Sequence, residues 1–324
     1  MKSVSISRAK TFRACPLLYD YTYVDKFVPV EQKPIYVTLK GLVLHETFEE
    51  LLKYENYEGE NPKLPYRRAE EDLVKKILEE KRSKNNVPED EAKNFHLELG
   101  VKRWLDFKHN YLDKNGHIMY SEKEYKQLLF GETETITILD LLEDCGDGNY
   151  VIYDYKTPKS ADLSRYKDQL VLYAYVMAIV KGLIQPDSTE FEKVADHFKL
   201  YVFFPLIWDD KKSEAEQATN YETCLKPLSF TAKDVETVIT HLKETCDEID
   251  AFDFTKPAEV LQPSKLSFQC NWCAFCGSAP QDIVSSKGKK FEGCPITHFC
   301  GKPAINESFK PVEPYTKVVV ESAD

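Results

Sequence analysis

Asp140, Asp154 and Lys156, in the middle of the chain, have the residue types and spacing of a metal-dependent hydrolytic site. Two carboxylates that share one site repel each other unless a cation lies between them, and hard oxygen ligands suit Mg²⁺ or Mn²⁺. Lys156 is two residues beyond Asp154, and the period of two along a strand puts both side chains on one face. An ammonium group there can hold an attacking water and offset charge on a pentavalent phosphate. The chemistry indicated is hydrolysis of a phosphodiester; the alternative is the solvated end of a hairpin.

Two strands and the turn between them must position these residues. Residues 135–139 alternate polar and apolar side chains, and residues 150–153 form a β-branched and aromatic run. Both patterns are typical of strands. Residues 144–149 supply the glycines and Asx residues of a tight turn. The sequence therefore predicts an antiparallel hairpin that brings Asp140 close to Asp154.

A helix is predicted next, over residues 164–177, with an apolar stripe that includes Leu170 and Met177. Gln169 and Tyr173 are four residues apart and therefore share one face of this helix. A polar pair beside an apolar stripe can extend over a site at the end of the preceding strand. The alternative is a boundary glutamine and a half-buried tyrosine with a hydrogen-bonded hydroxyl.

His45 lies within a predicted amphipathic helix over residues 39–52. Leu42, Phe48 and Leu52 flank it at helical spacing, so we expect the imidazole to point inward. As a metal ligand it would be a neutral imidazole oriented by a second partner. The alternative is a hydrogen-bonded core histidine.

Together these motifs resemble the RecB-type branch of the PD-(D/E)XK nuclease superfamily. This branch holds the RecB and AddB nuclease domains and the CRISPR-associated RecB-like exonucleases. The residues that carry the resemblance stand in the family's order and span nearly the whole chain. They are residues 7–16 with Tyr19, Gly41 with His45, Asp140, residues 154–157, Gln169 with Tyr173, and a cysteine cluster that begins at Cys270.

The resemblance implies a divalent-metal site and a catalytic lysine. Its ligands would be His45, Asp140 and Asp154 together with the carbonyl group of Tyr155. Lys156 would be the catalytic lysine. The second acidic position is an aspartate, where the superfamily more often has glutamate, although aspartate is frequent in this branch.

The same resemblance implies the fold and one further functional element. Gln169 and Tyr173 would match the family's Q-x-x-x-Y element, which helps to position the substrate or the lysine. The fold would be α/β, with a restriction-endonuclease-like PD-(D/E)XK core in which helices flank a mixed central sheet. A helical insertion and a C-terminal cysteine-rich metal-binding region would complete it.

The chain has nine cysteines, and their density near the C-terminus indicates a bound metal. Cys270, Cys273 and Cys276 form a C-x-x-C-x-x-C run. The first residues lack the apolar segment of a secretion signal, and no stretch has the length of a membrane span. We therefore expect an intracellular protein with no membrane association, in which these cysteines do not form a disulfide framework.

In the resembled family, one N-terminal cysteine joins three C-terminal cysteines around a 4Fe-4S cluster. Cys15 is the corresponding N-terminal residue, in a helix that Ser7 is expected to cap. The expected cluster ligands are Cys15, Cys270, Cys273 and Cys276. Cys294 is an alternative to Cys276, and Cys276 is favoured because its spacing matches ordinary cluster-binding runs.

Zinc is the competing metal for the C-terminal cysteines. Its ligands would be Cys270 and Cys273 with Cys294 and either His298 or Cys300. Both metals could also be present. Three isolated cysteines are expected to be inert thiols; these are Cys145, Cys224 and Cys246.

The composition permits a globular nucleic-acid enzyme. The chain has 324 residues, of which 42% are hydrophobic, and 43 basic against 54 acidic residues give a net charge of −11. Phosphate contacts depend on local patches, not on the overall charge. One candidate patch contains Lys156, Lys159, Arg165 and Lys167.

Four regions are predicted along the chain. They are N-terminal helices with one cluster cysteine and the histidine motif (1–56), a helical insertion (57–117), a nuclease core (118–255) and a cysteine-rich Fe-S-binding region (256–324). Within the insertion, Trp104 and Phe107 are expected in the core, although stacking on bases is the alternative. Residues 209–227 are predicted to form a polar loop. Glu122 is a possible further acidic ligand, but a surface role is favoured.

The predicted function is a metal-dependent DNA nuclease, in particular an exonuclease that acts on single strands or DNA ends. Because the chain lacks the G-x-x-x-x-G-K motif of a phosphate-binding loop, any helicase or recombination motor would be a partner protein. The alternative is a non-catalytic nucleic-acid-binding or scaffold subunit of a helicase-nuclease complex.

Overall fold

The computed structural model describes residues 2–29, 36–53, 66–85, 87, 91–115, 117–256, 273, 275, 283–285 and 287–291. The chain divides into two compact units. The first contains Met1–Ser3 and Tyr36–Ile239, and the second contains Val4–Ile35 and Thr240–Asp324. The four regions anticipated from the sequence remain a prediction.

A mixed six-stranded sheet is the centre of the first unit as far as its residues are described. The strand order is β1-β4-β5-β6-β7, and β3 also pairs with β4. Strand β5 is antiparallel to β4 and parallel to β6. The strands are β1 (Lys2–Val4), β3 (Ile118–Phe130), β4 (Thr133–Gly146), β5 (Asn149–Tyr155), β6 (Phe198–Phe203) and β7 (Leu225–Leu228). The mixed α/β fold with a central mixed sheet is therefore confirmed.

The predicted hairpin of β4 and β5 is present. Leu141 of β4 pairs with Tyr153 of β5 in antiparallel register. The turn uses three residues with positive φ, since Gly146, Asp147 and Gly148 have φ angles of 81°, 50° and 74°. Glycine and aspartate tolerate this left-handed backbone, which explains why they occur at the turn.

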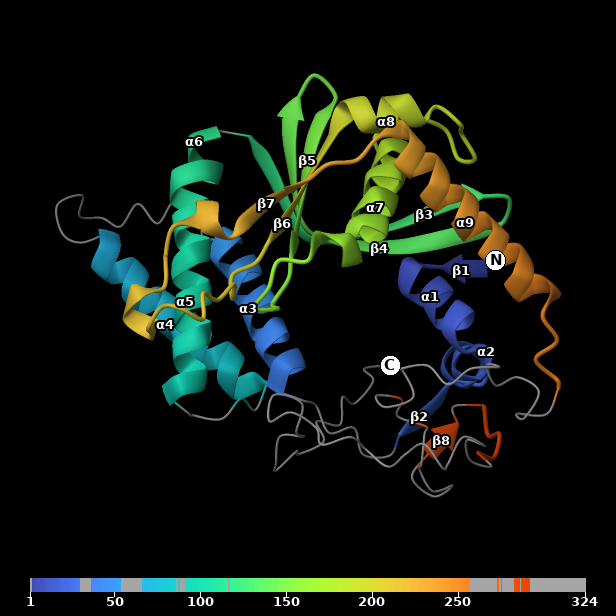
Figure 1. Ribbon diagram of the computed structural model, residues 1–324, viewed down its shortest axis with the longest axis horizontal. Coiled ribbons are helices and arrows are strands. Elements are labelled where there is room, and N and C mark those ends of the chain that lie inside the picture. Colours follow the sequence, from blue (N-terminus) through green and yellow to red (C-terminus); the bar gives the residue numbers. More distant parts are fainter. Residues whose placement is uncertain are drawn as a thin grey trace. The chain divides into compact units, whose positions relative to one another are not determined.

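Helices flank the sheet, with α3 and α5 on one side of β5 and β6 and α7 and α8 on the other (Figure 1). The helices of this unit are α3 (Tyr36–Lys53), α4 (Tyr66–Lys84), α5 (Glu91–Phe107), α6 (Asp113–Asn115), α7 (Lys167–Val180) and α8 (Phe191–His197). A π-helical turn, Lys108–Leu112, joins α5 to α6, and 3₁₀ turns lie at Leu163–Arg165, Glu214–Glu216 and Tyr221–Thr223. Helix α9 (Ala232–Ala251) begins in the first unit and ends in the second. No helix in the described part of the chain is both long and apolar enough to cross a membrane.

Aromatic packing joins α3 and α5 to the sheet. Phe48 stacks on Trp104 with ring centroids 5.1 Å apart, and Phe107 stacks on Phe203 at 5.1 Å. Tyr155 packs edge-on against Phe48 at 5.2 Å. Trp104 and Phe107 are fully buried. Core packing, not stacking on bases, is therefore their role, as favoured from the sequence.

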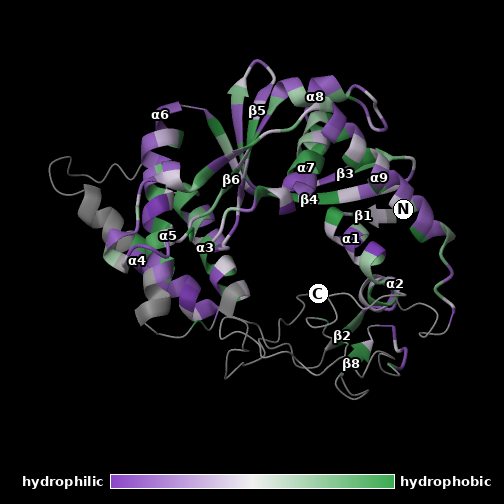
Figure 2. Cartoon of the chain, viewed as in Figure 1, coloured by the Kyte–Doolittle hydropathy of each residue, from purple (hydrophilic) through white to green (hydrophobic). Residues whose placement is uncertain are grey.

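Helix α7 covers the other face of the sheet. It is apolar along most of its length (Figure 2), and Leu170 and Met177 are fully buried as the predicted stripe requires. Tyr153 and Tyr155 face α3 and α5. Because successive side chains of a strand point to opposite faces, Asp154, which lies between them in the sequence, points toward α7.

Three sequence-based expectations are wrong in detail. Leu42 is 45% exposed, because the buried stripe of α3 runs through neighbouring positions such as Val43 and Leu44. The segment predicted to be a polar loop contains β7, an edge strand whose Pro227 is tolerated there. Ser5, not Ser7, caps the first helix, since its side chain accepts a hydrogen bond from the Arg8 amide at 3.2 Å.

The second unit brings the N-terminal segment together with the C-terminal region. Its elements are α1 (Ile6–Ala14), α2 (Pro16–Tyr19), the π-helix Asp20–Val24, β2 (Phe27–Pro29), the end of α9 and β8 (Ile283–Ser285). Strand β2 pairs with β8 in antiparallel register. One hydrophobic core contains Cys15, Leu17, Tyr21, Phe27, Phe275, Ile283 and Phe291.

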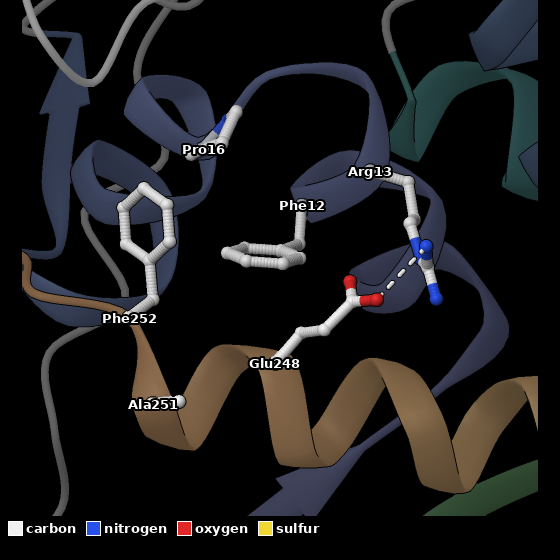
Figure 3. A pocket seen from close by; sticks show the side chains of 6 residues that line it. All are labelled: Phe12, Arg13, Pro16, Glu248, Ala251 and Phe252. Atoms are coloured by element: carbon white, nitrogen blue, oxygen red, sulfur yellow. Dashed lines mark ion pairs between the residues drawn. The ribbon is translucent and has the colours of Figure 1, made fainter.

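An open pocket of about 510 Å³ lies on this unit between α1 and the end of α9 (Figure 3). Arg13 and Glu248 form an ion pair at 3.2 Å at one side of it. Phe12 and Phe252 pack edge-to-face at 5.2 Å at the other. None of the predicted site residues lines this pocket, so it carries no role in the chemistry below.

Asp20 gives the second unit a specific pH dependence. It is 4% exposed, and its Oδ1 atom has no hydrogen-bond partner. Burial, followed by the nearby charge of Asp25, raises the pKa of Asp20 to about 6, although Lys289 and Lys287 oppose the shift. The unfolded chain has a lower pKa, so stability is fully present below about pH 4 and is lost as the pH rises through 6.

Asp20→Asn should therefore increase the free energy of unfolding, by up to about 3 kcal/mol above pH 7 and by progressively less toward pH 4. Urea unfolding followed by circular dichroism between pH 4.5 and 7.5 measures the difference. Asp247→Asn, an exposed change in the same unit, is the matched control. A constant difference between Asp20→Asn and wild type over this range would contradict the prediction.

Candidate active site

The hairpin places the two predicted aspartates opposite each other, near the end of β5 and in the middle of β4. Because Leu141 pairs with Tyr153, Asp140 and Asp154 occupy the next opposed positions. Asp154 is 3% exposed. Asp140 Oδ2 accepts a hydrogen bond from the Tyr155 amide at 2.5 Å, which fixes this carboxylate against the backbone of β5.

His45 enters the same site from α3. Its Nε2 atom lies 3.1 Å from the carbonyl oxygen of Tyr155. Its Nδ1 atom lies 3.3 Å from Asp140 Oδ1 and 3.5 Å from Glu122 Oε1. The structure therefore brings together the histidine, the aspartate and the carbonyl group that the sequence assigned to one metal site.

Glu122 belongs to this group, and the surface role favoured from the sequence is wrong. Ser121 pairs with Leu141 and Lys123 with Leu139, so Glu122 stands opposite Asp140. Its backbone has a φ of 45°, in the left-handed region that glutamate rarely adopts. Its side chain is 24% exposed and turns toward His45.

These side chains fit a hard divalent cation. One donor atom each of His45, Glu122 and Asp140 lie within 4.8 Å of one another. Glu122 Oε1 is buried without a hydrogen bond. Burial lowers the pKa of His45, but the neighbouring carboxylates of Asp140 and Glu122 outweigh this effect and raise it to about 10. Two carboxylates that stabilise a proton on the imidazole can stabilise a cation in its place.

Lys156 and Asp154 form the second half of the site. Lys156 Nζ lies 2.9 Å from Asp154 Oδ1, to which it donates a hydrogen bond, and 2.7 Å from Oδ2. Burial raises the pKa of Asp154 to about 7, and Asp140 adds to the shift while Lys156 and His45 oppose it. Burial lowers the pKa of Lys156, but Asp154 and Asp140 produce a net rise. Lys156 is therefore a cation held against a buried acid.

Helix α7 and the residue before it bring three more side chains to the lysine. Gln169 Nε2 donates a hydrogen bond to the Tyr173 hydroxyl at 2.5 Å, as expected for a pair on one face. Burial raises the pKa of Tyr173, and the charges of Asp154 and Lys156 also act on it. Tyr166, which the sequence analysis missed, lies with its ring centroid 5.3 Å from Lys156 Nζ. Its position directly before α7 is the only sequence signal for it.

The predicted cluster cysteines are placed only in part. Cys15 belongs to the core of the second unit and caps α2, where its Sγ accepts a hydrogen bond from the Leu18 amide at 3.3 Å. Cys273 packs against the same core. The remaining predicted ligands, Cys270 and Cys276, lie outside the described residues, as do Cys294, His298 and Cys300.

A second group of possible ligands contains His117, Glu143 and Cys145. Glu143 already accepts hydrogen bonds from Asn115 at 3.0 Å and from the hydroxyl of Tyr153, and it lies 2.6 Å from His117 Nδ1. The carboxylate is therefore fully engaged by protein groups, and a cation is not needed to explain its burial.

Glu122→Gln should weaken Mn²⁺ binding by at least about tenfold, because it removes one negative charge beside His45 and Asp140. Calorimetric titration of the EDTA-treated protein measures this effect. Glu124→Gln, at an exposed position on the same strand, should leave the affinity unchanged. Equal affinities for the two variants would remove Glu122 from the site.

Among three comparisons with known proteins, the match to a family model agrees with the superfamily that the motifs indicated. The solved structure titled "Crystal structure of SSO0001" matches at 15% identity and a TM-score of 0.32, over 76% of this chain and 98% of that one. No curated protein matches the chain in sequence. The family model of the PD-(D/E)XK nuclease superfamily matches residues 3–277, which include every residue of the site described above. The chain therefore belongs to the PD-(D/E)XK nuclease superfamily.

Proposed function

We propose that the protein is a metal-dependent DNA nuclease of the RecB-like branch that cuts single strands or DNA ends with Mg²⁺ or Mn²⁺. The observation that carries the proposal is the meeting of His45, Asp140 and the Tyr155 carbonyl beside the Asp154–Lys156 pair. The preference for DNA, for ends or single strands, and for a helicase or recombination partner rests on the sequence resemblance to that branch.

The metal would be held by His45, Asp140, Asp154 and the carbonyl group of Tyr155. Glu122 stands close enough to join them. When bound, such a metal supplies a nucleophilic water at neutral pH and stabilises negative charge on the phosphate. Asp154 is exposed by only 3%, so bulk water competes little for this position.

Lys156 offsets the charge that develops on the phosphate and orients the attacking water. Its ammonium group pairs with Asp154 and lies 5.3 Å from the ring centroid of Tyr166. The Gln169–Tyr173 pair adds polar groups beside it that position the lysine or the substrate. The hydrogen bond between this pair limits its freedom before substrate arrives.

Asp140→Asn should abolish Mn²⁺ binding and reduce cleavage by at least about 10³-fold, because it removes a ligand charge. Lys156→Ala should reduce cleavage by about 10²-fold or more while Mn²⁺ binding persists. Cleavage of single-stranded, double-stranded and end-blocked DNA, with calorimetry of metal binding, separates the two effects and reports the substrate preference.

Lys193→Ala, at an exposed position on α8, is the matched control and should cleave as wild type does. Undiminished cleavage by either site variant would overturn the mechanism. Wild-type protein that binds DNA without cutting any of the three substrates would instead be a non-catalytic binding or scaffold subunit.

We further propose a structural 4Fe-4S cluster bound by Cys15, Cys270, Cys273 and Cys276. The support is that Cys15 and Cys273, 258 positions apart in the printed sequence, belong to one hydrophobic core. The amide hydrogen bond to Cys15 Sγ is of the kind that stabilises a cluster thiolate. A cluster of this kind would close a long loop of chain and so stabilise the second unit.

Cys15→Ser and Cys273→Ser should each lose iron and sulfide, and with them the visible absorption of iron-thiolate charge transfer. Anaerobic purification, metal analysis and an absorption spectrum measure this loss. Cys145→Ser, in the first unit, should keep the full iron content.

Zinc without iron in the wild-type protein would favour the alternative site, which uses Cys270, Cys273, Cys294 and His298 or Cys300. Full iron content in Cys15→Ser would remove the N-terminal ligand from the proposal.

A further inference from the structure

Four segments of the first unit contribute cationic and aromatic side chains to one group near Lys156. Its members are Lys40, His96, Lys159 and Trp208. Lys159 Nζ lies 5.0 Å from the ring centroid of Trp208, and the Trp208 amide donates a hydrogen bond to the Lys159 carbonyl at 3.0 Å. The rings of His96 and Trp208 meet edge-on with centroids 4.8 Å apart. Lys40, on α3, lies close enough to Lys159 and His96 for their charges to interact.

The arrangement concentrates positive charge. Burial lowers the pKa of Lys40 to about 8, and the nearby charge of Lys159 lowers it further. Burial lowers the pKa of His96 to about 4, with added contributions from Lys159 and Lys40. The charge of Lys159 therefore disfavours a positive charge on Lys40, and both lysines disfavour one on His96; a bound anion would offset this repulsion.

The exposed fraction differs among these four side chains. Lys40 is 7% exposed, His96 and Trp208 are half-buried, and Lys159 is exposed. An anion can therefore approach from solvent at Lys159, with the buried charge of Lys40 close by. Because Lys159 and His96 already contact the Trp208 ring, the ring serves better as a support for these side chains than as a platform for a base.

Buried hydrogen bonds hold Trp208 in place. The Arg103 guanidinium donates to the carbonyl oxygens of Pro205 and Ile207 at 2.8 Å each and to that of Ala218 at 2.7 Å. Arg103 is 1% exposed and lies seven residues after His96, on the same face of α5. The group is therefore positioned before any ligand binds.

The group lies close to the cleavage centre along the chain. Lys159 is three residues from Lys156, a span of at most about 10 Å. A Cβ atom on Gly41, the residue after Lys40, would lie only 3.4 Å from Thr157 Oγ1, so α3 passes directly beside this segment. A strand whose scissile phosphate lies at Lys156 can place a flanking phosphate at Lys159.

We propose that Lys40, His96 and Lys159, supported by Trp208, form a binding subsite for a nucleic-acid phosphate that flanks the scissile bond. This inference rests on the proposed nuclease function. The ligand is either an internal phosphodiester or a terminal phosphate, and both present the same anionic oxygens.

The test uses full-length Asp140→Asn protein, which keeps the strand uncut, with short oligothymidylates that carry a 5′-phosphate or a 5′-hydroxyl. At pH 5.5 the ring resonances of His96 should change from neutral to protonated when either strand binds. Lys159→Gln should bind about tenfold more weakly, with the slope of log affinity against log salt smaller by about one. Lys193→Gln, the matched surface control, should bind as the parent protein does.

Equal affinities for the two strands would identify an internal phosphodiester as the ligand, and tighter binding of the phosphorylated strand would identify a terminal phosphate. Unchanged His96 resonances on strand binding, or equal affinities of Lys159→Gln and Lys193→Gln, would overturn the subsite. These measurements need no cleavage. If the His96 resonances change on strand binding but the wild-type protein cleaves no substrate, only the nuclease proposal is contradicted. If the wild-type protein cleaves DNA but the His96 resonances do not change, only the subsite proposal is contradicted.

Discussion

Negative charge buried where β5 ends beside β4 is the constraint on which the rest of the structure depends. Asp154 is almost fully buried and lies beside Asp140, an arrangement that is unfavourable unless cations compensate for it. The protein supplies Lys156 from the same strand and His45 from α3. Helix α3 must therefore dock where its imidazole meets the Tyr155 carbonyl, and the aromatic contact of Phe48 with Tyr155, less than one turn later, holds it there.

Features set by local spacing could be predicted from the sequence. The turn residues and the alternating pattern predicted the β4–β5 hairpin, which the structure contains. The four-residue spacing of Gln169 and Tyr173 predicted that they share one face of a helix, and they are hydrogen-bonded there. Alternation alone does not fix which face of a strand is buried. In β4 the threonines Thr135 and Thr137 are buried while Ile136 is 43% exposed, because the packing of the whole sheet decides this.

The position of Glu122 opposite Asp140 could not be predicted from the sequence, because it depends on an irregularity in the pairing of β3 with β4. Phe130 pairs with Thr133 across the turn, and a regular ladder counted from that pair would put Glu122 opposite Leu141. A bulge between Leu128 and Phe130 shifts the register by one residue, so that Glu122 faces Asp140. A register shift of one residue moves every side chain of the strand to the other face and so changes which residues can meet in a site. The sequence pattern within the strand does not indicate such a shift.

The net charge of −11 and the proposed substrate are compatible because the charges are sorted locally. Acidic side chains converge at His45, where a metal cation would bind, and cationic side chains converge at Trp208, where a phosphate would bind. The short segment from Lys156 to Lys159 joins the two groups. Within each group, side chains of like charge lie close together in a partly buried setting. A metal ion at the first group and a strand phosphate at the second would each offset like charges, so both ligands favour the complex in which they are bound together.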